Sequence, residues 1–88
     1  MIPNQVVNVV CQSLDVSTVC VIGKCGIRRV REARCMIAGI LNGRGFATWE
    51  IAALFGCDKS TAWRLVERHE KLLAECAKYR EKAGRVEI

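Results

Sequence analysis

Apolar residues recur every three or four positions along most of the chain, which is the spacing of one face of a helix. Pro3 suits the first turn of a helix ending at Leu14, because the N–H that proline lacks has no helical partner there. The next three residues interrupt the pattern, and Ser17 can cap a short second helix over 18–22 that Gly23 closes. The β-branched residues of this segment also fit a strand, but the chain offers no second strand to pair with it, so the pattern favours a helix.

Two more helices follow from the same spacing. The third extends from about Arg29 to Asn42, and Asn42 and Gly43 form a pair that tolerates the left-handed backbone found at many helix ends. Thr48 can cap a short fourth helix, and Gly56 stops it.

The last helix has the most regular apolar stripe. Asp58 can cap its start, and the pattern continues to about Ala83, where Gly84 is a natural stop. We therefore predict an all-α fold, a compact cluster of about five helices that forms a single domain over residues 1–88.

Length and charge narrow the function. The chain has 88 residues, enough for one small domain, and 51% of them are apolar, enough to build a core. Its net charge is +5, from 14 Lys and Arg against 9 Asp and Glu. A basic domain of this size is typical of a binding module rather than of an enzyme with a deep pocket, and nucleic acid is the most common partner of such modules. We expect no enzymatic activity and no cofactor.

Six cysteines occupy scattered positions: 11, 20, 25, 35, 57 and 76. The closest pair, Cys20 and Cys25, could belong to a zinc site or a disulfide. Zinc motifs usually contain two close pairs, however, and the only histidine, His69, is distant in sequence. Cysteine in a reducing cytosol usually behaves as a small buried apolar residue. We therefore predict buried or inert thiols and no metal site.

Neither a membrane span nor a signal peptide is predicted. No run approaches the roughly 18–20 apolar residues that cross a bilayer. The uncharged start of the chain lacks the positive leader of a secretory signal. We expect a cytoplasmic protein with no membrane partner.

Segment 48–67 has the pattern of a helix-turn-helix, in which a tight turn at Gly56 joins two helices. In this motif the second helix enters the major groove of DNA, and the residues of its first turns meet base edges and phosphates. The free N–H groups and the positive dipole end of a helix start also attract phosphate. The candidate DNA-contacting residues of this segment are Thr48, Trp49, Asp58, Lys59, Ser60, Thr61 and Arg64.

Two helices around a glycine turn can also do no more than build a core. The apolar residues expected to hold this pair together are Ile51, Phe55, Cys57, Ala62 and Leu65. Trp49 fits either a DNA contact or core packing, and Trp63, one step off the apolar stripe, fits half-burial. His69 lies on the stripe, so we predict a packed core residue rather than a catalytic one.

Positive charge is concentrated at residues 23–34, where a glycine-containing loop leads into the third helix. Glu32 is the only acidic residue there, and the cations are Lys24, Arg28, Arg29, Arg31 and Arg34. The spacing of three places Arg28, Arg31 and Arg34 on roughly one face, with Arg29 to the side. This segment indicates a surface that binds phosphates. The alternative is a solvent-exposed face on which the aliphatic parts of the arginine side chains cover apolar surface.

These motifs resemble the C-terminal DNA-binding domain of the bacterial replication initiator DnaA. The resemblance spans about residues 6 to 75, and its motifs occur in the family's order. The family's early helix end and turn match Val10–Cys11 and Leu14–Asp15–Val16–Ser17, and its G-K matches Gly23–Lys24. Its basic helix start matches Arg28 and Arg31–Glu32–Ala33–Arg34. Its E-I-x-x-x-F-G motif matches Glu50–Ile51 through Phe55–Gly56. Its D-H-[ST]-T signature is similar to Asp58–Lys59–Ser60–Thr61.

The resemblance implies a fold like that of the DnaA C-terminal domain and Trp repressor, and binding of a DNA duplex in the major groove with the basic loop in the adjacent minor groove. It also implies a bacterial or phage-encoded protein associated with the nucleoid. The chain departs from the family at Lys59, which replaces the signature histidine, at Gly26 and Ile27, which replace basic loop residues, and in a turn one residue shorter. It also lacks the phosphate-binding motif of an ATPase, so we expect no nucleotide cofactor.

The sequence therefore predicts a sequence-specific double-stranded DNA-binding protein, a small regulator of replication or transcription. Two alternatives remain open. The first is a protein-interaction module with an idle helix-turn-helix, in which the apolar first helix or the long last helix pairs with itself or with another regulatory protein. The second is the DNA-binding piece of a recombinase or transposase whose catalytic residues lie on another chain.

Overall fold

The structure, a computed structural model, describes residues 3–23 and 28–86 and contains only helices within those ranges. This confirms the predicted all-α cluster. The six helices of the described residues are α1 (Pro3–Leu14), α2 (Thr18–Ile22), α3 (Arg28–Gly43), α4 (Thr48–Phe55), α5 (Lys59–Glu75) and α6 (Ala77–Gly84).

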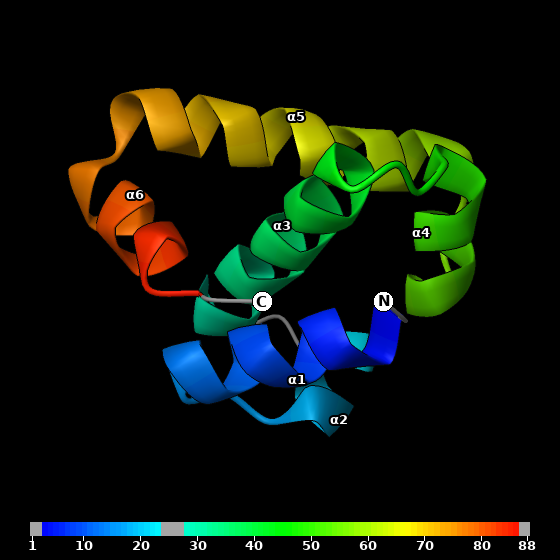
Figure 1. Ribbon diagram of the computed structural model, residues 1–88. Helices are drawn as coiled ribbons and strands as arrows, with labels where there is room; N and C mark the ends of the chain where they lie inside the picture. Colours follow the sequence, from blue (N-terminus) through cyan, green and yellow to red (C-terminus); the bar gives the residue numbers. More distant parts are fainter. Residues whose placement is uncertain (1–2, 24–27, 87–88) are drawn as a thin grey trace.

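The central helix is α3, and the other helices pack around it (Figure 1). The beginning of α3 lies near α1 and α2, and its end lies against α5. In the same view α4 and α6 lie at opposite ends of α5. Because helices pack on several sides of α3, its four consecutive residues 35–38 are all buried, as expected for a helix enclosed all round.

The turn after α1 follows from a left-handed residue. Asp15 has φ 55°, a conformation that short polar side chains tolerate better than most. The N–H of Val16 donates to the carbonyl of Cys11 at 3.0 Å, which closes the helix end. Ser17 stands at the N-cap position of α2, as predicted, although its side chain makes no capping hydrogen bond.

The loop between α3 and α4 corrects two details of the sequence analysis. The left-handed residue after α3 is Gly45, with φ 95°, rather than Asn42 or Gly43, because α3 continues through Gly43. The N-cap of α4 is Ala47, not Thr48. Alanine cannot cap with its side chain, but the Glu50 carboxylate accepts a hydrogen bond from the Ala47 N–H at 3.1 Å.

The predicted helix from Asp58 to Ala83 is in fact two helices. Cys76 adopts an extended conformation (φ −112°, ψ 107°) that breaks the chain between α5 and α6. The break has a physical reason, because the ring nitrogen Nδ1 of His69 and the hydroxyl of Tyr79 are 2.6 Å apart. Ten residues of unbroken helix would separate them by about 15 Å along the axis.

The side chain of Arg80 stabilises the same break. Its guanidinium donates to the carbonyls of Leu73 (2.7 Å) and Ala74 (3.1 Å), two carbonyls at the end of α5 that lack helical partners. A positive charge at the C-terminus of a helix also complements the helix dipole. The hydrogen bonds of Arg80 and that between His69 and Tyr79 therefore both stabilise two separate helices here.

Candidate nucleic-acid interface

The turn between α4 and α5 has the backbone geometry of a tight helix-turn-helix. Gly56 is left-handed (φ 66°, ψ 34°), a conformation that favours glycine. The N–H of Cys57 donates to the carbonyl of Ala52 at 3.0 Å, which closes α4. Asp58 then caps α5, since its carboxylate accepts from the Thr61 N–H at 2.9 Å. The stop at Gly56 and the cap at Asp58 were both predicted from the sequence.

The apolar residues of the two helices hold them in place. Ile51 and Ala62, on α4 and α5, are fully buried. The other three residues expected at this contact, Phe55, Cys57 and Leu65, are partly buried and pack against the core. Burial of apolar surface stabilises a fold by about 25 cal/mol per Å². The burial of these side chains therefore holds α4 and α5 against the core.

The first turns of α5 present polar side chains to solvent. Lys59, Ser60, Thr61 and Arg64 are all exposed. Asp58 is exposed too, but its hydrogen bonds with Thr61 lower the pKa of the carboxyl, and the positive charge of Arg64 acts in the same direction. Asp58 is thus a carboxylate that caps the helix and binds the side chain of Thr61, while the side chains of Lys59, Ser60 and Arg64 are exposed.

Both tryptophans lie largely at the surface. Trp49, on α4, is 60% exposed, and Trp63, on α5, is 49% exposed. Tryptophan is enriched at interfaces because it combines an apolar body with a polar N–H group, so both side chains are accessible to a partner. The half-burial expected of Trp63 is confirmed, and Trp49 does not belong to the core.

The predicted basic surface at the start of α3 is only partly assembled. Arg28, Arg29 and Arg31 are exposed, and Arg28 forms a 3.5 Å ion pair with Glu32. Lys24 lies outside the described residues. These three arginines remain available to an anionic partner, since an exposed ion pair is a weak competitor.

Arg34 behaves differently, because its guanidinium binds the end of α2. It donates to the carbonyls of Val21 (2.8 Å) and Cys20 (3.2 Å), and also to that of Gly23. A five-residue helix is too short to be stable alone, and these bonds satisfy carbonyls at its C-terminus. Arg34 therefore has a structural role that sequence reasoning missed.

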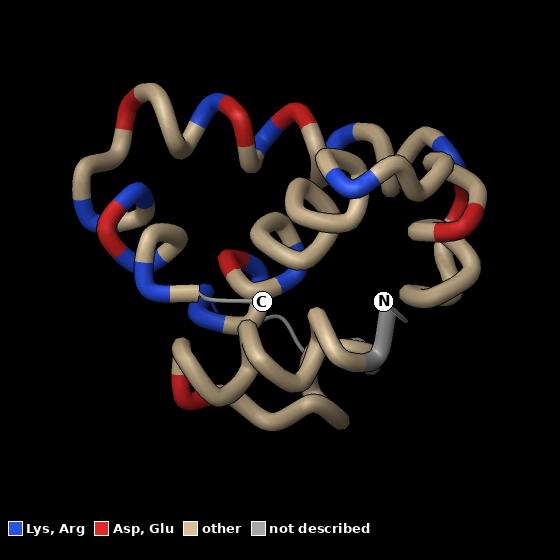
Figure 2. The backbone as a smooth tube through the Cα atoms, viewed as in Figure 1, with Lys and Arg blue, Asp and Glu red and all other residues tan. Residues whose placement is uncertain are grey.

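Arg34 also lies within electrostatic reach of the α4–α5 turn. Burial raises the pKa of the Cys57 thiol, the Asp58 carboxylate raises it further, and the positive charge of Arg34 opposes both. Figure 2 shows how charge is distributed: the tubes of α1 and α2 carry none, while Lys, Arg, Asp and Glu alternate along α5 and α6.

A buried pair of polar residues, His69 on α5 and Tyr79 on α6, stabilises the fold. His69 is 8% exposed and contacts Tyr79 both by the 2.6 Å hydrogen bond and ring edge to face. Burial lowers the pKa of the His69 imidazole, which favours its neutral form. The prediction of a core histidine is confirmed; its partner Tyr79 was not foreseen, because the sequence does not indicate the break at Cys76.

The described cysteines are free thiols: Cys11, Cys20, Cys35, Cys57 and Cys76. Two of them, Cys11 and Cys35, are buried, and the other three are partly buried. Burial raises the pKa of the thiols of Cys11 and Cys35, so they are poor nucleophiles. Residues 3–23 and 28–86 contain no cluster of metal-ligating side chains, and none of their helices is long and apolar enough to cross a membrane.

Neither the models of known protein families nor the curated protein sequences match this chain. The resemblance to the DnaA domain therefore rests on the motifs themselves.

Proposed function

We propose that this chain binds double-stranded DNA as a small regulator of replication or transcription, with the start of α5 in the major groove. One observation carries the proposal. A helix-turn-helix is held rigidly on the core, and the first turns of its second helix present four exposed polar side chains, Lys59, Ser60, Thr61 and Arg64. This is the arrangement with which such motifs reach base edges.

Phosphate contacts would come from two places on the surface. Lys59 and Arg64 flank the base-reading turn of α5, and Arg28, Arg29 and Arg31 are exposed at the start of α3. Arg34 is not among them, since its guanidinium binds the carbonyls of α2. Five phosphate contacts give a slope of log K against log salt of about −4 to −5.

The affinity experiment is a salt titration. Fluorescence anisotropy with a labelled duplex of random sequence should give that slope, and Arg31→Ala should flatten it by about 0.9 while weakening binding to every duplex. Lys71→Ala is the matched control, because Lys71 is also exposed and its loss removes the same charge from the far half of α5. Absence of binding at low salt, or equal effects of the two substitutions, would reject the proposal.

The specificity experiment distinguishes the residues that contact bases from the residues that contact phosphates. Selection of preferred duplexes from a random pool should return one sequence for the unaltered chain. Ser60→Ala and Lys59→Ala should return a different one, because their side chains are placed to meet base edges. Arg31→Ala should leave the preferred sequence unchanged. If all three variants lose affinity equally on every duplex, the assigned division of roles is wrong.

A second candidate function, self-association, is favoured by the surface of α1 and α2. Neither helix contains a charged residue, yet Val19 is 79% exposed and Ile22 is 39% exposed. Both line a groove of about 590 Å³ that also contains Val7 and Thr18. Sedimentation equilibrium of the unaltered chain and of Val19→Lys tests this function, because a charge on that face should abolish any dimer.

A further inference from the structure

A cavity of about 620 Å³ lies away from the base-reading turn of α5. Its walls come from the start of α3, from α6 and from the turn between α1 and α2. This volume is within the range of small-molecule sites, about 300–1,000 Å³. None of the exposed polar residues at the start of α5 lines it.

Part of the cavity wall is apolar. Val16 and Cys20 contribute from the α1–α2 turn and α2, and Val30 and Tyr79 contribute from α3 and α6. Val16 and Cys20 are partly exposed and offer apolar surface to the cavity, whereas Val30 and Tyr79, at 3% and 1% exposure, are packed in the core. Such a wall can cover the apolar body of a small ligand, whereas a bare ion would leave it unused.

The charged part of the wall is predominantly positive. Arg28 and Arg29 come from the first turn of α3, and Lys78 and Lys82 come from α6. They face two carboxylates, those of Asp15 and Glu32. The first turns of two helices, α3 and α6, both line the cavity, so the positive ends of two helix dipoles add to the excess of cations.

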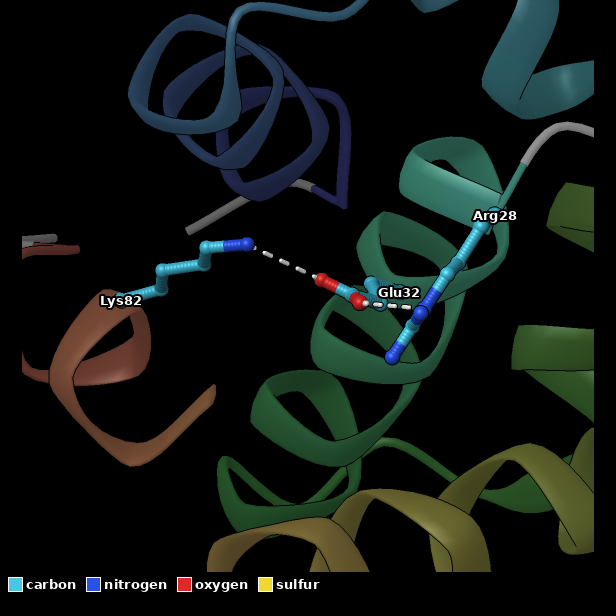
Figure 3. Close-up of polar contacts among 3 residues, drawn as sticks. All are labelled: Arg28, Glu32 and Lys82. Carbon is cyan, nitrogen blue, oxygen red and sulfur yellow. Dashed lines mark hydrogen bonds and ion pairs between the residues drawn. The ribbon is translucent and has the colours of Figure 1, made fainter. Parts of the chain in front are cut away.

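Glu32 shows that a carboxylate is held between these cations (Figure 3). Its Oε2 is 3.2 Å from Nζ of Lys82, which reaches across from α6, and its Oε1 is 3.5 Å from Nε of Arg28. The other two cations, Arg29 and Lys78, make no hydrogen bond or ion pair with any residue that the structure describes. One carboxylate of the chain thus occupies two of the four cations, and two remain open.

We propose that this cavity binds a small organic anion, with its carboxylate or phosphate group on Arg29 and Lys78 and its apolar body against Val16 and Cys20. The site does not include the DNA-reading turn of α5, although it shares Arg28 and Arg29 with the proposed phosphate contacts, and binding of the anion does not require that the chain bind DNA. Carboxylates and phosphate monoesters share the recognition chemistry, because both place oxygens against cationic side chains and helix starts.

The binding experiment uses four probes on the unaltered chain, titrated by calorimetry at low ionic strength. Phenyl phosphate and benzoate combine an anionic group with an aromatic body, and both should bind with a Kd of about 1 mM, as expected for ligands this small. The tighter of the two identifies the anionic group that the site prefers. Inorganic phosphate lacks the body and benzyl alcohol lacks the charge, so each should bind at least about tenfold more weakly.

A pair of double variants tests the assigned cations. Arg29→Gln with Lys78→Gln should weaken phenyl phosphate binding at least about tenfold. The matched control, Arg68→Gln with Lys71→Gln, removes the same two charges from exposed positions on α5 outside the cavity and should leave the Kd unchanged. Equal losses in both variants would mean general attraction to a basic protein and would overturn the site.

An NMR titration of the unaltered chain keeps the proposal testable if a variant folds poorly. Amide shifts caused by phenyl phosphate should be concentrated at the turn between α1 and α2, at the start of α3 and along α6. Shifts centred on the α4–α5 turn would overturn the proposal, as would inorganic phosphate binding as tightly as phenyl phosphate. Failure of all probes to bind at tenfold above the expected Kd would overturn it as well.

Discussion

Replacing Gly39 with alanine should destabilise the protein, although alanine is the better helix former. Gly39 lies in the middle of α3, and a Cβ atom at this position would overlap the imidazole ring of His69. That ring is buried and is hydrogen-bonded to Tyr79 at 2.6 Å. The extra methyl group must therefore displace His69, and the hydrogen bond between α5 and α6 is lost with it.

Three contributions to the free energy of unfolding decide whether Gly39→Ala stabilises or destabilises the protein. A glycine-to-alanine change inside a helix contributes about 0.5–1 kcal/mol of stability. Against this, overpacking a core costs about 1–3 kcal/mol. Leaving a buried hydrogen-bonding group without its partner costs about 1–3 kcal/mol more. The net loss for Gly39→Ala is therefore about 1–5 kcal/mol, and helix propensity cannot reverse it.

Urea unfolding followed by far-UV circular dichroism measures this loss as a lower midpoint at constant slope. Gly43→Ala is the matched control, because Gly43 is in the same helix and a Cβ there meets nothing within 4 Å. The control should be unchanged or slightly more stable than the unaltered chain. If Gly39→Ala unfolds at the same urea concentration as Gly43→Ala, the close approach of α3 and α5 at His69 is refuted.

Three further predictions use the same unfolding assay. Tyr79→Phe should lower the free energy of unfolding by about 1–3 kcal/mol, because it leaves the buried Nδ1 of His69 without a partner; an unchanged value would contradict the hydrogen bond. Burial lowers the pKa of His69, so as the pH falls below about 6.5 the unfolded chain takes up a proton before the folded one. Stability should therefore be constant above that pH and decline from there down to the lower pKa of the folded state, and His69→Phe should lack this decline. Arg34→Ala should cost about 1–3 kcal/mol, since three carbonyls at the end of α2 lose their donor. Arg31→Ala, which removes an exposed arginine from the same helix, should change stability by no more than about 0.5 kcal/mol; equal losses would contradict the role of Arg34.

The local features of the candidate interface could be predicted from the sequence because each depends on one or two neighbouring residues. A left-handed turn needs a residue such as Gly56, and a helix start needs a capping side chain such as that of Asp58. The apolar spacing placed Ile51 and Ala62 in the core, where the structure has them. The exposure of Lys59 follows from the same spacing, because it lies off the apolar stripe.

The role of Arg34 could not be predicted in this way. In the sequence it is one of five cations in a basic segment, and nothing nearby separates it from Arg31. Only the packing of α2 against α3 brings the carbonyl of Val21, thirteen residues earlier, within 2.8 Å of its side chain. The charge of the segment alone therefore does not show that the Arg34 guanidinium is bound within the fold.

The sequence by itself determined the all-α class, the stop of α4 at Gly56 and the polar, Asp58-capped start of α5, because helical periodicity and capping act within a few residues. The tertiary structure decided which side chains meet across helices. The break at Cys76, the buried contact of His69 with Tyr79, and the bridge from Lys82 to Glu32 fifty residues away all depend on how α3, α5 and α6 pack. The free energy of these contacts depends on burial and mutual orientation, and neither exists until the helices have come together.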